Sequence, residues 1–134
     1  MYNKIIDYVC EMVEDFEPIE LVNHEEFLAY NIIENKLYVP DFMEEDKDFD
    51  NFMIHYLKEE FDLEITEEEL NIFYVLHELG HKETRDSINY DRYEEEINKL
   101  DINDYIGYRK VLAEYLADNW AVCFIKTFGI EKLK

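Results

Sequence analysis

Apolar residues recur along much of the chain at intervals of three and four, the spacing that buries one face of an α-helix. This pattern predicts an N-terminal helix over residues 3–16, ended by Pro18, and a second helix over residues 49–61. A third helix is expected over residues 67–82, because Thr66-Glu-Glu-Glu69 forms a Thr-x-x-Glu capping box directly before an apolar-periodic run.

The second half of the chain is predicted to add two more helices, separated by polar sequence. Residues 83–103 lack a clear period, apart from a short helix expected over Tyr93–Leu100. A long helix is then expected to begin at Asp104 or Tyr108 and to continue to Phe128, with Gly129 near its end.

Between the first two helices the pattern changes to short apolar runs that predict strands. Phe27–Ile33 and Leu37–Val39 flank a polar turn and stop at Pro40, and Ile19–Val22 is expected to add a short strand. A small antiparallel sheet packed with helices indicates an α+β fold. We expect one domain over residues 1–134.

The composition fits a packed domain with an acidic surface. Hydrophobic residues make up 48% of the chain, which argues against disorder. The net charge of −21 argues against direct binding to nucleic acid or an anionic membrane. It would favour an encounter with basic partners or metal cations, and an ordinary solvated acidic surface is the alternative. No signal peptide or membrane span is expected, so a cytoplasmic location is predicted.

Cys10 and Cys123 are far apart, which argues against a disulfide framework, and Cys123 is expected to be buried.

The residues His77-Glu-Leu-Gly-His81 form an HExxH motif on the helix expected over residues 67–82. Two histidines four positions apart lie on one helix face, so both imidazoles can bind one metal ion. Glu78 lies beside the first histidine, where it can take a proton from a zinc-activated water. The motif therefore predicts a Zn²⁺ site with Glu78 as the catalytic base. Two ordinary histidines on an amphipathic helix are the alternative.

A catalytic zinc needs a third protein ligand, and the last expected helix offers two carboxylates. Glu114 and Asp118 share a face with Ala117 and Ala121, whose small side chains allow a second helix to approach closely. Glu114 is the candidate ligand. Asp118, one turn later, can accept a hydrogen bond from the second nitrogen of a ligand histidine and fix its orientation. Surface exposure of both carboxylates is the alternative in so acidic a chain.

Phe73-Tyr-Val-Leu-His-Glu-Leu-Gly-His81 together with Glu114-Tyr-Leu-Ala-Asp-Asn-Trp-Ala121 resembles the two motifs of ImmA/IrrE-type metallopeptidases. Members of that family are gluzincins, in which HExxH lies on one helix and a glutamate from a later helix completes the zinc site. The resemblance covers mainly residues 70–82 and 111–124, and it implies a zincin-like core. The implied roles are zinc ligation by His77, His81 and Glu114, base catalysis by Glu78, and hydrogen bonding to a ligand by Asp118.

These observations predict a zinc metallopeptidase that hydrolyses a peptide bond with zinc-activated water. The substrate is expected to be a protein or peptide, and the resemblance indicates a DNA-binding repressor of a phage or mobile element. A non-catalytic acidic protein that keeps this fold and sequesters a basic DNA-binding partner is the alternative, although the intact Glu78 favours a peptidase. The donor that stabilises the oxyanion is expected among four tyrosines: Tyr90, Tyr93, Tyr105 and Tyr108.

Overall fold

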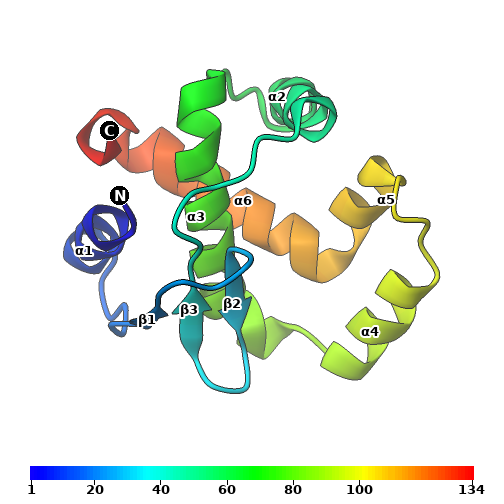
Figure 1. Cartoon of the computed structure of the whole chain (residues 1–134), viewed down its shortest axis with the longest axis horizontal. Helices are drawn as coiled ribbons and strands as arrows, with labels where there is room; N and C mark the ends of the chain where they lie inside the picture. The colour runs from blue at the N-terminus through cyan, green and yellow to red at the C-terminus, as the bar shows by residue number, and fades with distance from the viewer.

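The computed structural model describes residues 1–134 as six α-helices and a three-stranded sheet, so the expected α+β class is confirmed (Figure 1). The first half contains α1 (Tyr2–Met12), β1 (Glu20–Val22), β2 (Ala29–Asn31), β3 (Lys36–Tyr38) and α2 (Lys47–Phe61). The second half contains α3 (Glu67–Thr84), α4 (Tyr90–Asn98), α5 (Tyr105–Lys110) and α6 (Leu112–Phe128), with 3₁₀ helices at η1 (Arg85–Ser87) and η2 (Glu131–Leu133). None of the helices combines the length and the apolar character needed to cross a membrane.

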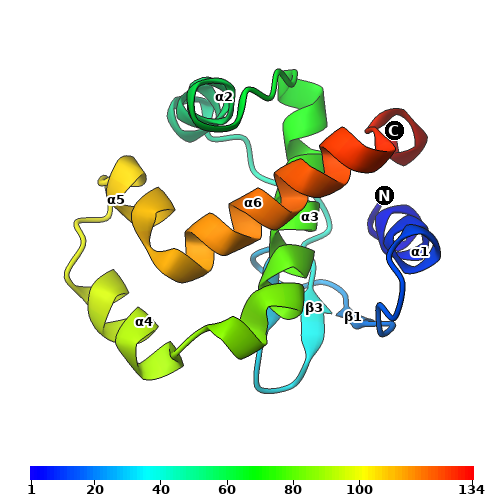
Figure 2. The same ribbon diagram turned by 180° about the vertical axis from the view of Figure 1, so that it is seen from behind.

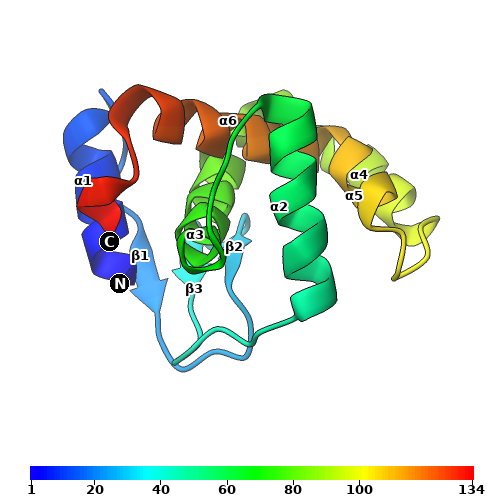
Figure 3. The ribbon, with the colours of Figure 1, turned by 90° about the horizontal axis from the view of Figure 1, so that it is seen from above.

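Helix α3 lies at the centre of the fold, between the sheet and α6. Viewed from above, the sheet lies on one side of α3 and α6 on the other, while α1 and α2 flank it (Figure 3). Figure 2 shows α6 crossing over α3, and this pair makes the most extensive contact between any two elements. Residues on nearly every face of α3 are therefore buried, including one histidine of the HExxH motif.

The sheet is mixed, with β3 in the centre and β2 at a free edge. β2 and β3 form an antiparallel hairpin whose turn includes Asn35 at a φ of 54°. β1 pairs with the other edge of β3 in parallel, with Leu21 opposite Leu37. The prediction of an antiparallel sheet is wrong for β1, because the connection over residues 23–28 leads to the far edge of the sheet and does not turn back on β1.

Helix α3 begins at the predicted capping box. The Thr66 hydroxyl accepts a hydrogen bond from the Glu69 N–H at 3.2 Å, and the Glu69 carboxylate accepts one from the Thr66 N–H at 2.9 Å. Asp46 caps α2 by accepting the N–H of Phe49 at 3.1 Å. These caps satisfy amide groups that the first helical turn leaves unpaired.

Two helix boundaries differ from those expected by three residues or more. α1 ends at Met12, four residues early, and Asp15 adopts the left-handed region at a φ of 62°. Acidic side chains are unfavourable at the negative end of a helix dipole, which opposes continuation through this segment. α4 begins at Tyr90, three residues earlier than expected, because the Asn89 side chain accepts the N–H of Arg92 at 3.2 Å and caps the helix.

The long C-terminal helix that the sequence predicts is broken at Val111. This residue has a φ of −62° and a ψ of 130°, so it ends α5 in an extended conformation and begins α6. Val111 is 5% exposed, and extended backbone suits a β-branched residue. The break allows α5 to leave the axis of α6 (Figure 2) and so determines where the side chains of α5 lie.

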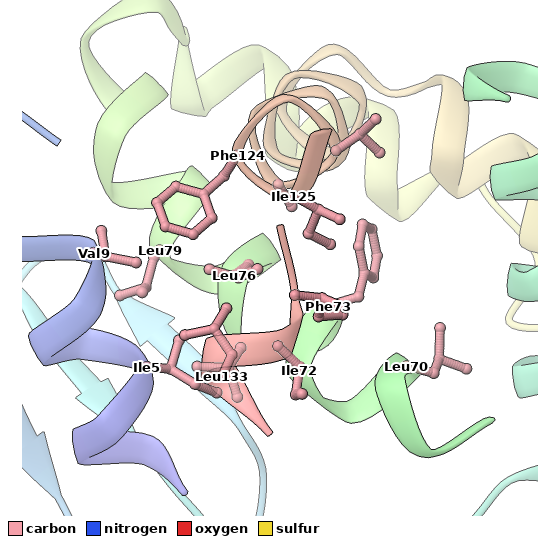
Figure 4. Close-up of a cluster of buried hydrophobic side chains, with 14 of the residues drawn as sticks. Ile5, Val9, Leu70, Ile72, Phe73, Leu76, Leu79, Phe124, Ile125 and Leu133 are labelled. Atoms are coloured by element: carbon pink, nitrogen blue, oxygen red, sulfur yellow. The ribbon is translucent and has the colours of Figure 1, made fainter. Parts of the chain in front are cut away.

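The hydrophobic core is formed where α1, α3, α6 and the C-terminal segment meet. Figure 4 shows side chains of all four elements in contact around α3. The labelled residues are Ile5, Val9, Leu70, Ile72, Phe73, Leu76, Leu79, Phe124, Ile125 and Leu133. Cys123 is exposed, so the expectation of a buried thiol is wrong. The apolar run around it covers more than one face of α6, and only part of that run points inward.

Candidate metal centre

The α3 and α6 helices approach closely where Gly80 faces Ala117. A Cβ atom added to Gly80 would lie 2.8 Å from the carbonyl oxygen of Ala117 and 3.1 Å from its Cα atom. Ala117 and Ala121 are both 0% exposed in the contact between the helices. The small residues therefore bring the HExxH face of α3 directly against the face of α6 that carries Glu114 and Asp118.

Glu114 lies opposite both histidines of the motif. Its Oε2 atom is 3.1 Å from His77 Nε2 and 3.0 Å from His81 Nε2. One ligand atom from each of the three residues lies within 4.8 Å of the others. The structure thus brings together, from two helices, a His-His-Glu group that can hold a metal ion.

The chemistry of this group fits a divalent ion such as zinc. Two imidazoles and one carboxylate form a known donor set of catalytic zinc sites, and ligand atoms around a tetrahedral zinc lie about 3.3 Å apart. The observed separations of 3.0 and 3.1 Å are close to that spacing. The charges agree as well: Glu78, Glu114 and Asp118 supply three negative charges and Arg109 supplies one positive charge, so a divalent cation would neutralise the group.

Asp118 holds the ring of His77 in position. Its Oδ1 atom lies 2.7 Å from His77 Nδ1, and the Asp118 side chain is fully buried. With Nδ1 engaged by this carboxylate, Nε2 of the same ring faces Glu114. The hydrogen bond that was expected between Asp118 and one of the histidines is thus present in the structure. Such a bond selects the tautomer and orientation that a metal ligand needs.

Arg109 is a further member of the site that the sequence pattern did not identify. Its Nη1 atom donates to Asp118 Oδ1 at 3.2 Å, and its Nη2 atom lies 3.7 Å from Glu114 Oε2. Residues nine positions apart on a continuous helix are two and a half turns apart and face opposite sides. Only the break at Val111 lets Arg109 reach Asp118, and no signal in the sequence marked that break.

Glu78 lies beside the His-His-Glu group and is held by the edge strand. Its Oε2 atom is 3.7 Å from His77 Nε2, and its Oε1 atom accepts the backbone N–H of Tyr30 at 3.0 Å. Tyr30 is in the middle of β2, so the sheet contributes directly to the orientation of this carboxylate. The role of the Tyr30 amide has no sequence signal, because any residue except proline supplies a backbone N–H.

Among the four tyrosines considered for the oxyanion, Tyr93 contacts the site directly. Its hydroxyl donates to Glu114 Oε1 at 3.3 Å. Burial, together with the nearby charge of Glu114, raises the pKa of Tyr93 well above its usual value and keeps the hydroxyl protonated. Tyr105 instead packs against Phe49 and Phe52, with ring centroids 5.3 and 5.4 Å apart.

The carboxylates favour positive charge between the two histidines. Burial lowers the pKa of His77, but the hydrogen bonds and negative charges of Asp118 and Glu114 outweigh that effect and raise it to about 10. Burial raises the pKa of Glu114, yet its hydrogen bonds and charge attraction with His77 and His81 bring that pKa far below the ordinary range. A proton or a metal cation can supply the positive charge that this environment stabilises.

Two cavities meet at the site. The larger, about 420 Å³, is lined in part by His77, Glu78 and Glu114, and lies toward the N-terminal end of α2. The smaller, about 280 Å³, is lined by His81 and Tyr93 and again by Glu78 and Glu114. Glu78 and Glu114 therefore line both cavities.

Comparison of the chain with protein-family models, with curated proteins and with solved structures found no match. The resemblance to ImmA/IrrE-type peptidases therefore depends on the motif residues alone. What the structure establishes is an α+β chain in which His77, His81 and Glu114 form a candidate metal centre.

Proposed function

We propose that this protein is a zinc-dependent peptidase with a zincin-like core. The observation that supports the proposal best is the placement of Glu114 against both histidines, with the Glu78 carboxylate beside them at the junction of two cavities. A structural zinc site has four protein ligands and is closed, whereas a catalytic site has three and leaves one position open. The site offers three ligands, and the Glu78 carboxylate lies beside them and lines a cavity without being a ligand itself. This matches the catalytic arrangement.

Each residue of the site has a role in this proposal. A zinc ion held by His77, His81 and Glu114 would polarise a carbonyl group and lower the pKa of water. Glu78, oriented by the Tyr30 amide, takes the proton of the attacking water and passes it to the leaving amine. Tyr93 keeps its hydroxyl proton and can donate a hydrogen bond to the oxyanion.

A basic protein is the substrate that the overall charge favours. The net charge of −21 attracts positively charged partners over long range. We propose a DNA-binding repressor of a phage or mobile element as the substrate, on the basis of this charge and of the motif resemblance. Binding of such a partner without cleavage is the alternative outcome, and the test below separates the two.

The test compares two glutamine variants that should fail in different ways. Glu78→Gln should keep zinc at the parent's level and lose cleavage by about 10²–10⁴, since the amide cannot take a proton. Glu114→Gln should lose most of its zinc, because a neutral amide is a poor replacement for a carboxylate ligand. Glu95→Gln, an exposed position on α4, is the matched control and should behave like the parent.

Metal content is measured by mass spectrometry of the purified variants, and cleavage is measured on a panel of basic DNA-binding proteins. Full cleavage by Glu78→Gln would refute the mechanism. Parent-level zinc in Glu114→Gln would refute the ligand assignment. Zinc in the parent, with capture of a basic protein and no cleavage, would favour the binding protein over the peptidase.

A further inference from the structure

The cavity of about 420 Å³ beside the candidate metal centre has an apolar wall and an acidic rim. Its inner end reaches His77, Glu78 and Glu114. Six apolar side chains from the loops before β2 and after β3 and from α2 form the wall: Phe27, Leu28, Pro40, Phe42, Met43 and Phe49. Clefts of roughly 300–1,000 Å³ with mainly apolar linings are typical ligand sites.

Two phenylalanines of this wall are unusually exposed. Phe27 is 68% exposed and Phe42 is 81% exposed, although most other phenylalanines of the chain pack into or against the core. Each belongs to a loop at the mouth of the cavity, one between β1 and β2 and the other between β3 and α2. Apolar surface that stays in water beside a cleft is stabilised when an apolar partner covers it.

The same two loops carry carboxylates that have no cationic partner. Glu26 and Glu44 line the cavity mouth, and neither forms an ion pair; the neighbouring Glu25 and Glu45 form none either. Glu26 and Glu44 line the same cavity as the two exposed aromatic rings, so together they attract a segment that carries both an apolar and a positively charged side chain.

The arginine that lines the cavity does not change this charge preference. Arg109 is close to two carboxylates, with Nη1 3.2 Å from Asp118 and Nη2 3.7 Å from Glu114. Its charge is therefore already balanced by the protein. An acidic side chain entering the cavity would meet Glu26, Glu44 and Glu78 without a free positive group, so an anionic ligand is disfavoured.

We infer that this cavity is the specificity pocket of the protein. It binds a large apolar side chain of the substrate next to the scissile bond, while a neighbouring lysine or arginine of the substrate lies against Glu26 and Glu44. This inference rests on the proposed peptidase function, since it places the apolar residue beside the bond that Glu78 and the metal centre would cleave. It selects, among basic proteins, those with a large apolar residue flanked by positive charge.

The experiment uses synthetic peptides with one variable residue in a serine and glycine frame. The variable residue is phenylalanine, leucine, alanine or glutamate, flanked either by lysines or by glutamates. Binding is measured by fluorescence anisotropy with zinc-loaded Glu78→Gln protein, so affinity does not depend on turnover. Cleavage of the same peptides by the parent protein is measured separately.

Lysine-flanked phenylalanine and leucine peptides should bind at least about tenfold more tightly than the alanine peptide, the effect expected from burying a large apolar side chain. Phe27→Ala with Phe42→Ala should remove most of this preference. Ile33→Ala with Ile102→Ala is the matched control, because those side chains are 93% and 82% exposed but do not line the cavity. Glu26→Gln with Glu44→Gln should weaken only the lysine-flanked peptides.

Equal affinity for the phenylalanine and alanine peptides would overturn the pocket assignment, and so would unchanged preference in the phenylalanine double variant. Cleavage at the same rate for every variable residue would overturn the pocket assignment but would still support the peptidase function. Selective binding of the phenylalanine peptide, with no cleavage by the parent, would support the pocket while contradicting the peptidase function. Failure of the inference and failure of the proposed function are therefore distinguishable.

Discussion

Replacement of Gly80 by alanine is predicted to separate the two helices that form the candidate metal centre. The added Cβ atom would lie 2.8 Å from the Ala117 carbonyl oxygen, which is backbone and cannot rotate away. An ordinary van der Waals contact begins near 3.4 Å, so α6 must move by about 0.6 Å relative to α3 at this point. Ala117 directly precedes Asp118 and lies one turn after Glu114, so both carboxylates move with it.

Two opposing effects determine the stability of this variant. Alanine in a helix interior is favoured over glycine by about 1 kcal/mol, whereas overpacking of a tight contact costs about 1–3 kcal/mol. The expected net effect is a destabilisation of about 0–2 kcal/mol, which lowers the melting temperature by up to about 8 °C. Metal sites tolerate displacements of only about 0.5 Å, so zinc affinity should fall at least about tenfold, which corresponds to about 1.4 kcal/mol and is similar in size to the effect on folding.

Zinc affinity is measured by competition with a chromogenic chelator, and stability by thermal unfolding of zinc-loaded and metal-free protein. Asn119→Ala is the control, because it raises helix propensity on the exposed face of α6. Zinc affinity within twofold of the parent, together with a raised melting temperature, would show that the helices absorb the methyl group. The close approach of α3 and α6 would then not be what sets the metal centre.

Three further predictions concern the metal and its surroundings. Chelation of bound metal should lower the melting temperature and added zinc should restore it, because the ligands join two helices; an unchanged melting curve after confirmed metal removal would refute this. The pKa of His77 is about 10 in the folded state against an ordinary value of 6.5, so its contribution to the stability of the metal-free protein is present in full below pH 6.5. Urea unfolding should therefore show that this contribution falls as pH rises toward 10, and chelator competition should show zinc affinity rising over the same range; a flat profile would refute the assignment. Arg109→Met should reduce zinc affinity about tenfold, because loss of a residue that orients metal ligands typically has an effect of this size. Arg109→Lys should restore part of the affinity, and unchanged affinity in Arg109→Met would contradict the positioning role of Arg109.

The parts of the site that sequence could predict are those encoded over short distances. The capping box at Thr66 fixes where α3 begins, and four-residue spacing within that helix places His77 and His81 on one face. Glu114 was recognisable because alanines one turn apart marked a face of α6 that suits close packing. In each case the information lies within a few turns of one helix, so no knowledge of tertiary structure is needed.

The parts that sequence could not predict depend on how separate segments meet. The order of strands in the sheet, and hence the parallel pairing of β1, is set by the path of a loop. The contact between Arg109 and Asp118 exists only because the chain breaks at Val111, where an apolar pattern continues without interruption. Phe27 and Phe42 read as ordinary strand or loop residues, and their common position on one cavity follows from folding alone.

The buried charges of the candidate metal centre are not explained by stability. Asp118 Oδ2 and Arg109 Nε are buried and make no hydrogen bond, and a buried polar group left unpaired costs about 1–3 kcal/mol. Well-packed apolar residues in place of a buried charged cluster are often neutral or stabilising, and most of the other buried residues of α3 and α6 are apolar. A protein that needed only to join these helices would thus gain from leucine or methionine at the positions of Arg109 and Asp118. Those side chains instead orient His77 and balance the charge around it. The residues that folding alone would disfavour are thus those that a candidate cation site needs in order to orient a ligand and balance its charge.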